Sequence, residues 1–275
     1  MNETVRFSRK VFVGGLPISV STEIDLLIFF SRFGCVSVTW PDKRHFGPGS
    51  KIKGYAFLLF KEEISVHVLL NNCLRNQEIF HIEVPFHPEG SSLIPFKLRR
   101  IQVRPWYLVN RWFFFDQPSE LLHRQTIFVG GVPRHLKASE LAFMINASFP
   151  GVRYVGLDVD KEYCFPKGAA RATFFTRESY LSALRARFLS ILYLDHRGME
   201  KKKILEMKPY VVDDVPCDEC PPSQPRPRLG NLFCPHTDCL RYLCEQCFRR
   251  AHPSSEKQFG SHRPLTKDPK ILLYT

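Results

Sequence analysis

The 275-residue sequence predicts an α+β fold, with two tandem βαββαβ domains followed by a small cross-braced module rich in cysteine and histidine. A strand signal that ends in Gly-Gly-x-Pro occurs twice, about 116 residues apart, and predicts the pair of domains. Six of the nine cysteines lie after residue 216 and predict the terminal module. Chains of this length usually divide into two or three domains, in agreement with both observations.

Each copy of the repeat begins with a short strand. Residues 9–17 read Arg-Lys-Val-Phe-Val-Gly-Gly-Leu-Pro, and residues 125–133 read Gln-Thr-Ile-Phe-Val-Gly-Gly-Val-Pro. A β-branched and aromatic run closed by glycine and proline is typical of a buried strand followed by a turn. A second strand that opens with Lys-Gly follows roughly 40 residues later, at 53–60 and at 167–174. The same two signals at matching spacing indicate a duplicated domain.

A helix is expected between the two strands of each copy. In the first copy, Thr22 is a candidate N-cap and Gly34 lies where a C-cap belongs. The apolar side chains expected on the inner face of this helix are Ile24, Leu27, Ile28 and Phe30. In the second copy, three residues at near-helical spacing precede Gly151, namely Leu141, Ile145 and Phe149.

A second helix and a final strand complete each copy. The helices are expected near 62–74 and 176–188, and the strands at 98–104 and 204–210. The resulting order, β-α-β-β-α-β, is the split βαβ or ferredoxin-like arrangement. Its two marked strands lie side by side at the centre of a four-stranded sheet, and one face of that sheet carries no helix.

Aromatic residues should project from this open face in the first copy. Alternate strand residues share a face, which places Phe12, Tyr55 and Phe57 together. RNA bases stack on such rings with roughly 1–3 kcal/mol per base, and Lys53 is placed to meet a phosphate. Residues 53–60 match the octapeptide of the RNA recognition motif (RRM) at every position. The sequence therefore predicts a surface that binds single-stranded RNA.

Each open face also has an alternative interpretation. The three aromatic residues of the first copy would also suit a buried core, but Val11 and Val13 already supply the inner face, which favours stacking. In the second copy, Phe128 keeps the first-strand aromatic, whereas Ala169 and Arg171 replace the other two. Either this domain contacts protein, or its arginine lays the guanidinium plane on a base or meets a phosphate.

The C-terminal tail offers eight soft ligands, enough for two four-coordinate zinc ions of structural type. The alternating pairs predict one ion bound by Cys217, Cys220, Cys244 and Cys247, and another bound by Cys234, Cys239, His252 and His262. His236 is interpreted as a loop residue because eight ligands are already assigned. The stretch 221–230 is rich in proline and poor in core-forming residues. Metal must therefore supply much of the folding free energy of the tail. A RING-type ligand order, which ends in cysteines, fits less well.

Charge and composition limit the partners. The net charge of +12 lies mainly in the repeats, with +5 over 1–106 (14 basic, 9 acidic) and +7 over 123–212 (15 basic, 8 acidic). Basic blocks suit a polyanion such as RNA, although they would also suit a merely soluble protein. No apolar run is long enough to span a membrane, and the N-terminus lacks the apolar core of a signal peptide. We expect no membrane partner, and metal rather than disulfides in the tail.

An enzyme and a protein-only adaptor are the rival functions. No glycine-rich phosphate loop, nucleophile elbow or paired acid–base cluster is found in the sequence. The predicted zinc sites are closed by four protein ligands each, which favours structural metal. We expect no enzymatic activity and no small-molecule substrate, and the intact aromatic face of the first copy argues against an adaptor that binds protein alone.

The repeats and the tail together closely resemble the cytoplasmic polyadenylation element-binding (CPEB) family, from about Arg9 to Pro264. Besides the RRM motifs, the resemblance rests on Trp40-Pro41, on residues 101–106, 163–168, 186–188 and 208–210, and on the Cys-Asp-Glu-Cys at 217–220 that starts a ZZ-type zinc module. The resemblance implies a cytoplasmic protein that binds U-rich elements of messenger RNA 3′ untranslated regions and controls polyadenylation and translation. It also implies that the zinc module recruits polyadenylation and translation-control proteins.

Motifs and resemblance together define the expected RNA contacts. These are Phe12, Trp40, Lys53, Tyr55, Phe57, Arg104, Trp106, Phe128, Lys167, Arg171, Lys208 and Tyr210. The predicted bounds are 9–106 and 124–212 for the two RRMs, 107–123 for a linker and 213–275 for the zinc module. The long regulatory N-terminal region of the family is expected to be absent, because the first strand starts almost at Met1.

The linker is unusually aromatic, with Trp112-Phe113-Phe114-Phe115 placed outside either predicted sheet. Such a run left in water would promote aggregation, so we expect it to be buried. One interpretation is a static staple that fixes the angle between the RRMs, which is favoured because it buries the rings in the free protein. The other is a flexible lid that orders over bound bases.

Overall fold

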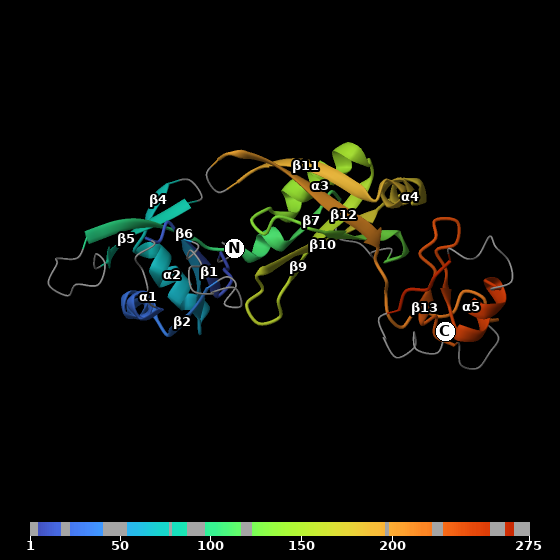
Figure 1. Cartoon of the computed structure of the whole chain (residues 1–275), viewed down its shortest axis with the longest axis horizontal. Coiled ribbons are helices and arrows are strands. Elements are labelled where there is room, and N and C mark those ends of the chain that lie inside the picture. The colour runs from blue at the N-terminus through green and yellow to red at the C-terminus, as the bar shows by residue number, and fades with distance from the viewer. Residues whose placement is uncertain are drawn as a thin grey trace, which may run out of the picture. The chain divides into compact units, whose positions relative to one another are not determined.

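The computed structural model describes residues 5–17, 23–40, 54–76, 79–86, 97–116, 123–195, 198–221, 228–253 and 262–266. The chain forms two compact units (Figure 1). The first consists of Met1–Arg111 with Val159–Lys167, and the second of Trp112–Asp158 with Gly168–Thr275. Within the described ranges, no helix is both long enough and apolar enough to cross a membrane.

The first unit contains the first βαββαβ domain. Its predicted elements are β1 (Lys10–Gly14), α1 (Glu23–Phe30), β2 (Val36–Thr39), β3 (Tyr55–Phe60), α2 (Glu63–Asn71) and β6 (Lys97–Arg104). The sequence analysis missed two strands that join the same sheet, β4 (Leu74–Asn76) and β5 (Ile79–Phe86). The strand order is β2-β3-β1-β6-β5-β4. The predicted central pair β1–β3 is thus confirmed, with Phe12 opposite Phe57.

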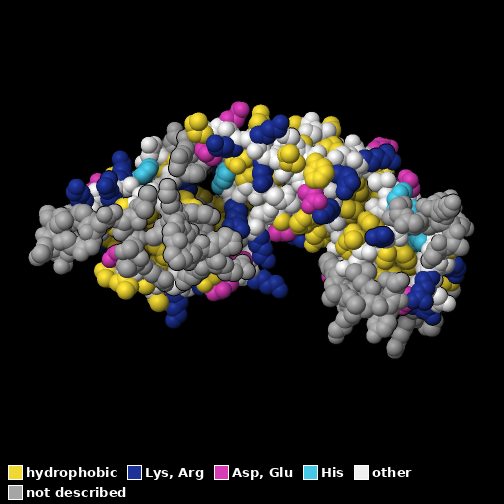
Figure 2. Space-filling view, in the orientation of Figure 1, with side chains coloured by type: hydrophobic (Ala, Val, Ile, Leu, Met, Phe, Trp, Pro, Cys, Tyr) yellow, Lys and Arg dark blue, Asp and Glu magenta, His cyan; other side chains and the backbone are white. Residues whose placement is uncertain are grey.

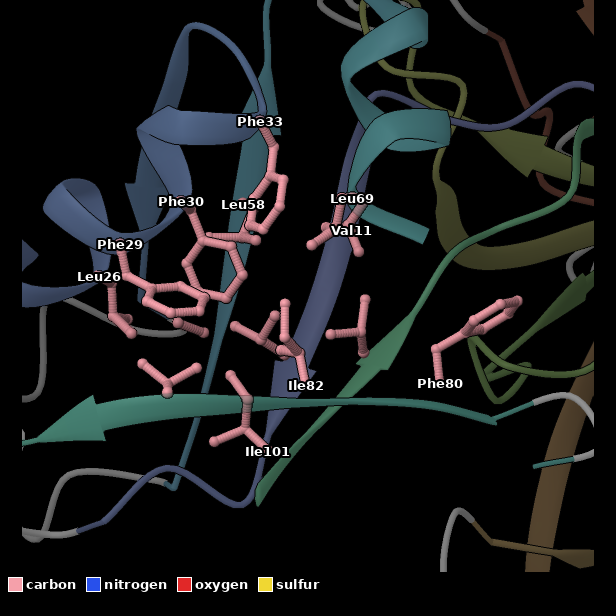
Figure 3. Close-up of a cluster of buried hydrophobic side chains, with 14 of the residues drawn as sticks. Val11, Leu26, Phe29, Phe30, Phe33, Leu58, Leu69, Phe80, Ile82 and Ile101 are labelled. Carbon is pink, nitrogen blue, oxygen red and sulfur yellow. The ribbon is translucent and has the colours of Figure 1, made fainter. Parts of the chain in front are cut away.

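One face of this sheet packs against both helices. Val11, Leu58 and Ile101 point from three different strands into a core that also holds Phe30 of α1 and Leu69 of α2 (Figure 3). All five side chains are fully buried, and burial of each stabilises the fold by about 1.5–3 kcal/mol. The alternating strand residues lie on the opposite face, where no helix covers them.

The predicted inner face of α1 is partly wrong. Ile24 and Ile28 are 61% and 71% exposed, whereas Leu26, Phe29 and Phe30 are buried. Six of the eight residues of this helix are apolar, so its sequence does not favour one face over another. Ring contacts select the face, because Phe29 and Phe30 pack against each other and against Phe33 of the following 3-10 turn.

Gly34 caps this 3-10 turn (Ser31–Phe33), as the sequence analysis expected at the end of the helix. Its φ is +144°, and a Cβ at this position would lie 2.0 Å from the hydroxyl oxygen of Ser65 on α2. Glycine is therefore required both by the backbone conformation and by the close approach of α2. Thr22, the predicted N-cap, lies outside the described residues.

The second unit repeats the arrangement. Its elements are β7 (Trp112–Phe114), β8 (Thr126–Gly130), α3 (Ala138–Ser148), β9 (Val152–Val159), β10 (Pro166–Phe174), α4 (Arg177–Ala186), β11 (Phe188–Leu194) and β12 (Glu200–Pro209). The strand order is β11-β12-β8-β10-β9-β7. Leu141 and Ile145 of α3 are fully buried, as their helical spacing predicted, while Phe149 is only half-buried. Figure 2 shows apolar side chains interspersed with Lys and Arg over this domain.

Residues 112–114 correct the expectation that the aromatic linker lies outside both sheets. They form β7, an edge strand that pairs with β9, with Trp112 opposite Gly156 and Phe114 opposite Tyr154. The ring centroids of Phe113 and Phe115 lie 5.6 Å and 5.2 Å from that of Phe143 on α3. The expected burial of the run is only partly met, because Trp112 is 45% exposed and the three phenylalanines are half-buried. The packing that these rings have lies within the second unit, which removes the main reason for favouring a staple.

The terminal module has very little regular structure. It consists of β13 (Leu232–Phe233), β14 (Tyr242–Leu243) and α5 (Glu245–Ala251). Among its described residues, only five apolar or aromatic side chains are buried besides the cysteines: Leu232, Phe233, Tyr242, Leu243 and Phe248. A core of this size cannot offset the conformational entropy of the ordered chain, so the module needs cross-links of another kind.

Candidate nucleic-acid interface and metal centres

The open face of the first sheet carries a cluster of three rings. Phe12 on β1 lies with its centroid 5.3 Å from Tyr55 and 5.9 Å from Phe57, and the two β3 rings are 6.1 Å apart. All three side chains are half-buried, because they cover one another and Lys10 lies over the Phe57 ring. The predicted projection from one face is confirmed, and the rings form a continuous platform for flat apolar groups.

Polar side chains continue this face along β6 and β5. Arg104 lies opposite Phe12, and Gln102 lies opposite both Gly14 and His81. Burial, together with Arg100 and Arg104 nearby, lowers the pKa of His81. The imidazole is therefore neutral near pH 7 and can both donate and accept a hydrogen bond. Its Nδ1 is buried and has no hydrogen-bond partner among the described residues.

The other three residues of the first domain that we expected to contact RNA differ in their positions and burial. Trp40 follows β2, is half-buried and packs against the core. Trp106 follows β6 and is only 6% exposed. Lys53 lies outside the described residues, so its expected phosphate contact stays a prediction.

The open face of the second sheet has the same register and different chemistry. Phe128 on β8 lies between Arg171 on β10 and Lys208 on β12. Burial disfavours the charged form of Arg171, but hydrogen bonds to the phenol oxygens of Tyr154 and Tyr210 raise its pKa. These contacts hold the guanidinium, which stays charged at all physiological pH values. The domain thus presents one ring between two cations.

The remaining predicted residues lie around this second face. Lys208 is exposed and pairs with Glu206 at 2.8 Å, a surface contact that is worth little in water. Lys167 is exposed near the start of β10. Tyr210 is half-buried, and its backbone N–H donates to the carbonyl of Thr126, which continues the β12–β8 pairing by one residue.

The tail brings its eight cysteine and histidine ligands into two clusters. One is Cys217, Cys220, Cys244 and Cys247, and the other is Cys234, Cys239, His252 and His262. The ligand atoms of each cluster lie within 4.8 Å of one another. The predicted cross-braced grouping is therefore confirmed, and His236 is in neither cluster.

The first cluster fits a tetrahedral ion closely. The Cys220 sulfur lies 3.9 Å from the Cys244 sulfur and 3.8 Å from the Cys247 sulfur, and four Zn–S bonds of the usual length separate sulfurs by about 3.8 Å. Burial raises the pKa of Cys247 to about 12. Neighbouring thiols in a buried cluster cannot all ionise without a cation, so binding a metal here would release protons.

The second cluster combines two thiols with two imidazoles. Nε2 of His252 lies 3.4 Å from the Cys239 sulfur, and Nδ1 of His262 lies 3.4 Å from the Cys234 sulfur. Nδ1 of His252 is 3.2 Å from the carbonyl oxygen of Phe248, to which it can donate. That hydrogen bond would leave the Nε2 lone pair directed into the cluster, as a metal ligand requires. Both clusters thus have donor sets and spacings compatible with zinc.

Several side chains of the interface were missed from the sequence. The sequence did not identify His81 and Gln102, because it did not predict β5 or the pairing of β5 with β6. Lys10 shares the face of Phe12 because residues two apart on a strand lie on one face, so the sequence was enough to predict its position. Phe165, which contacts Phe57, lies more than a hundred residues away in the chain, and no local pattern could have identified it.

Comparison with known proteins gives matches at both ends of the chain. Residues 8–105 match the RNA recognition motif family. Residues 202–268 match the family described as the cytoplasmic polyadenylation element-binding protein ZZ domain. The second match covers both cysteine–histidine clusters, and the first covers all strands of the first sheet.

Similar full-length proteins cover nearly all of the chain. Translational regulator orb2 of Drosophila melanogaster is 40% identical over 265 residues, which are 96% of this chain and 36% of that protein. Cytoplasmic polyadenylation element-binding protein 1 of Caenorhabditis japonica is 36% identical over 274 residues, which are 95% of this chain and 42% of that protein. The chain therefore spans less than half the length of these relatives.

Among solved structures, the RNA recognition domains 1 and 2 of sex-lethal from Drosophila melanogaster align with 72% of this chain and 98% of their own. The identity is 16% and the TM-score is 0.24.

Proposed function

Because the chain belongs to the cytoplasmic polyadenylation element-binding protein family, we propose that it binds single-stranded messenger RNA and regulates its translation. The observation that carries this proposal is the platform of Phe12, Tyr55 and Phe57, which lies beside Arg104 on the sheet face opposite the two helices. Solvent-facing rings next to a cation suit unpaired bases joined by phosphates. The relative named as a translational regulator supports the second half of the proposal.

We further propose that the bound RNA is U-rich and lies in 3′ untranslated regions, and that the protein acts on cytoplasmic polyadenylation. The support is the family resemblance over the motifs around both open faces. Base identity would be read by hydrogen bonds to base edges, for which Gln102 and the neutral His81 lie beside the stacking platform. The proposed location is the cytoplasm, where such messages are translated.

For the tail, we propose two structural zinc ions and a protein-docking role. Four thiolates on one Zn²⁺, with two thiolates and two neutral histidines on the other, shift the net charge of residues 213–275 from +1 (9 basic, 8 acidic) to about −1. A surface of that charge attracts RNA poorly and suits partner proteins. Polyadenylation and translation-control proteins are the proposed class of partner.

The test is a binding titration with labelled single-stranded RNAs of matched length, one U-rich, one C-rich and one of mixed sequence, with duplex RNA as a fourth probe. We expect tight binding of the U-rich strand and weak binding of the duplex. A folded variant with both Tyr55→Ala and Phe57→Ala should lose most of the affinity. The matched control is Phe143→Ala, which removes a ring that is 59% exposed on α3 of the second domain.

Two results would contradict the proposal at different levels. Equal affinity for the U-rich and C-rich strands would remove the base preference and leave general RNA binding. Full affinity in the folded double variant would remove the platform as the binding site. A protein-only adaptor would bind none of the four RNAs, and an enzyme is not proposed because the matching families are binding domains.

A further inference from the structure

Residues 159–167, which contain the connection 160–165 between β9 and β10, belong to the first compact unit. The hydroxyl of Ser8 donates to the carbonyl of Tyr163 at 2.6 Å, and the guanidinium of Arg9 donates to the carbonyl of Glu162 at 2.8 Å. Both contacts reach backbone oxygens, so they hold the path of the segment whatever its side chains are. The segment therefore has a defined place beside β1.

The segment is also organised internally. The carboxylate of Asp160 accepts hydrogen bonds from the backbone N–H groups of Tyr163 and Phe165, at 2.6 Å and 3.0 Å. The backbone N–H of Asp160 donates to the carbonyl of Phe165 at 3.0 Å, and Cys164 takes a positive φ of 54° to close the turn. These bonds present Phe165 from a tight and ordered loop, so its ring needs little ordering when a ligand binds.

The ring of Phe165 stands against the platform of the first sheet. Its centroid lies 5.6 Å from that of Phe57, with an angle of 75° between the two planes. Nζ of Lys10 lies over both rings, 4.7 Å from the centroid of Phe57 and 5.3 Å from that of Phe165. Two nearly perpendicular rings therefore form a corner with an ammonium group between them.

Trp106, which contacts Phe165, holds a buried hydrogen-bond donor beside this corner. Its centroid lies 6.5 Å from that of Phe165, and the side chain is 94% buried. The indole Nε1–H has no hydrogen-bond partner among the described residues. A buried donor without an acceptor is costly, and such groups call for an explanation such as an acceptor supplied on binding. Bases carry carbonyl acceptors and phosphates carry anionic ones.

We propose that Phe165 is a nucleotide-contacting residue of the first domain, although it is supplied by the β9–β10 connection. In this arrangement one base stacks in the corner of Phe57 and Phe165, and Lys10 meets the adjoining phosphate or a base carbonyl. The ligand class is an unpaired RNA nucleotide, because the bases of a duplex are stacked on one another and offer no free face to the corner. The inference rests on the proposed RNA binding and adds a residue and a position to it.

The experiment compares Phe165→Leu with Phe165→Tyr in the full chain, titrated with the U-rich single strand. Leucine keeps apolar packing and removes the stacking face, so affinity should fall by roughly 5- to 150-fold, the range for loss of one base-stacking ring. Tyrosine keeps the face and should retain the parent affinity. Thermal unfolding of both variants should match the parent, and Phe143→Leu is the control for loss of an exposed ring elsewhere.

Other outcomes separate this inference from the proposed function. If Phe165→Leu binds as the parent does while the Tyr55/Phe57 double variant fails, the inference is wrong and the proposed function stands. Tighter binding by Phe165→Leu would also overturn the inference, because the ring would then cover the site. If the parent binds no single-stranded RNA, the proposed function itself fails.

A second measurement tests the inference without any substitution, in case a Phe165 variant does not fold. The unmodified parent is photo-crosslinked to RNA that contains 4-thiouridine, and the crosslinked peptides are identified by mass spectrometry. We expect crosslinks both to the peptide that contains residues 55–60 and to the peptide that contains Phe165. Crosslinks to residues 55–60 without any to residues 160–167 would overturn the inference.

Discussion

The two open sheet faces share one register and differ in chemistry. On the first sheet, the β1 ring of Phe12 lies between Phe57 and Arg104. On the second sheet, the equivalent ring of Phe128 lies between Arg171 and Lys208. The same backbone thus places an aromatic neighbour in one domain and a cation in the other. A duplicated scaffold can therefore keep its geometry while each copy takes a different share of the binding.

The difference predicts two distinguishable contributions to RNA affinity. Stacking on rings depends weakly on salt, whereas neutralising phosphates releases counterions and depends on it strongly. If the first face binds mainly by stacking, its variants should lower RNA affinity at every salt concentration. Substitutions of the cations of the second face should mainly change the slope of log K against log salt.

The largest effect is expected from the double substitution Tyr55→Ala and Phe57→Ala. Each lost ring should cost roughly 1–3 kcal/mol of binding free energy, and the salt slope should stay close to that of the parent. Affinity measured at several salt concentrations, with circular dichroism to check the fold, tests this. A large change of the salt slope would mean that the first face binds RNA through charge, as the second face does.

The next effect is expected from Phe128→Ala, which removes the ring that lies between Arg171 and Lys208 on the second face. A base that stacks on this ring predicts a loss of roughly 1–3 kcal/mol, about half that of the double variant. The measurement is the same titration. No loss in a folded variant would favour the alternative interpretation of the second domain, in which its face contacts protein instead of RNA.

A smaller effect is expected from Arg171, where two substitutions separate its two possible roles. If the guanidinium meets one phosphate, Arg171→Ala should reduce the salt slope by about 0.7, and Arg171→Lys should restore it. If it stacks on a base instead, lysine should fail as badly as alanine, because only arginine has a planar face. Arg185→Ala is the matched control, since Arg185 is exposed in the last turn of α4.

The smallest effect on RNA affinity is expected from removing metal. A chelator should release about two zinc ions per chain and unfold residues 213–275, because the described part of the module has only five buried apolar or aromatic side chains besides its cysteines. RNA affinity should change little if the two sheets carry the binding. Lowering the pH should act in the same direction as the chelator, because bound thiolates and imidazoles must stay deprotonated.

Metal analysis, far-UV circular dichroism and RNA titration of the chelated protein check these outcomes together. A tail that keeps its structure without metal, or a content of one ion per chain, would contradict the two-site assignment. A strong loss of RNA affinity on chelation would show that the zinc module is a third RNA-binding region beside the two sheet faces.

Local patterns were enough for much of this protein. The octapeptide at 53–60 predicted the β3 rings of the platform, and the spacing of the cysteine and histidine pairs predicted both metal clusters. Such signals work because the chemistry depends on neighbours within a few residues, and because the strand period of two assigns each side chain to a face.

Tertiary structure decided what local patterns left open. The helix at 23–30 is apolar on almost every side, so only packing against Phe33 and the sheet chose Leu26 and Phe29 over Ile24 and Ile28 as its buried side chains. The aromatic run at 112–115 became an edge strand because β9 offered an unpaired edge, a condition that lies about 40 residues further along the chain.

The corner formed by Phe57, Phe165 and Lys10 shows the same limit at the site itself. Alternation along β1 and β3 places Lys10 and Phe57 on one face, and this much could be read from the sequence. That Phe165 meets them depends on hydrogen bonds from Ser8 and Arg9 to backbone carbonyls of a distant loop. Contacts of that kind carry no residue pattern, because a carbonyl oxygen is present at every position, and so only the folded chain reveals them.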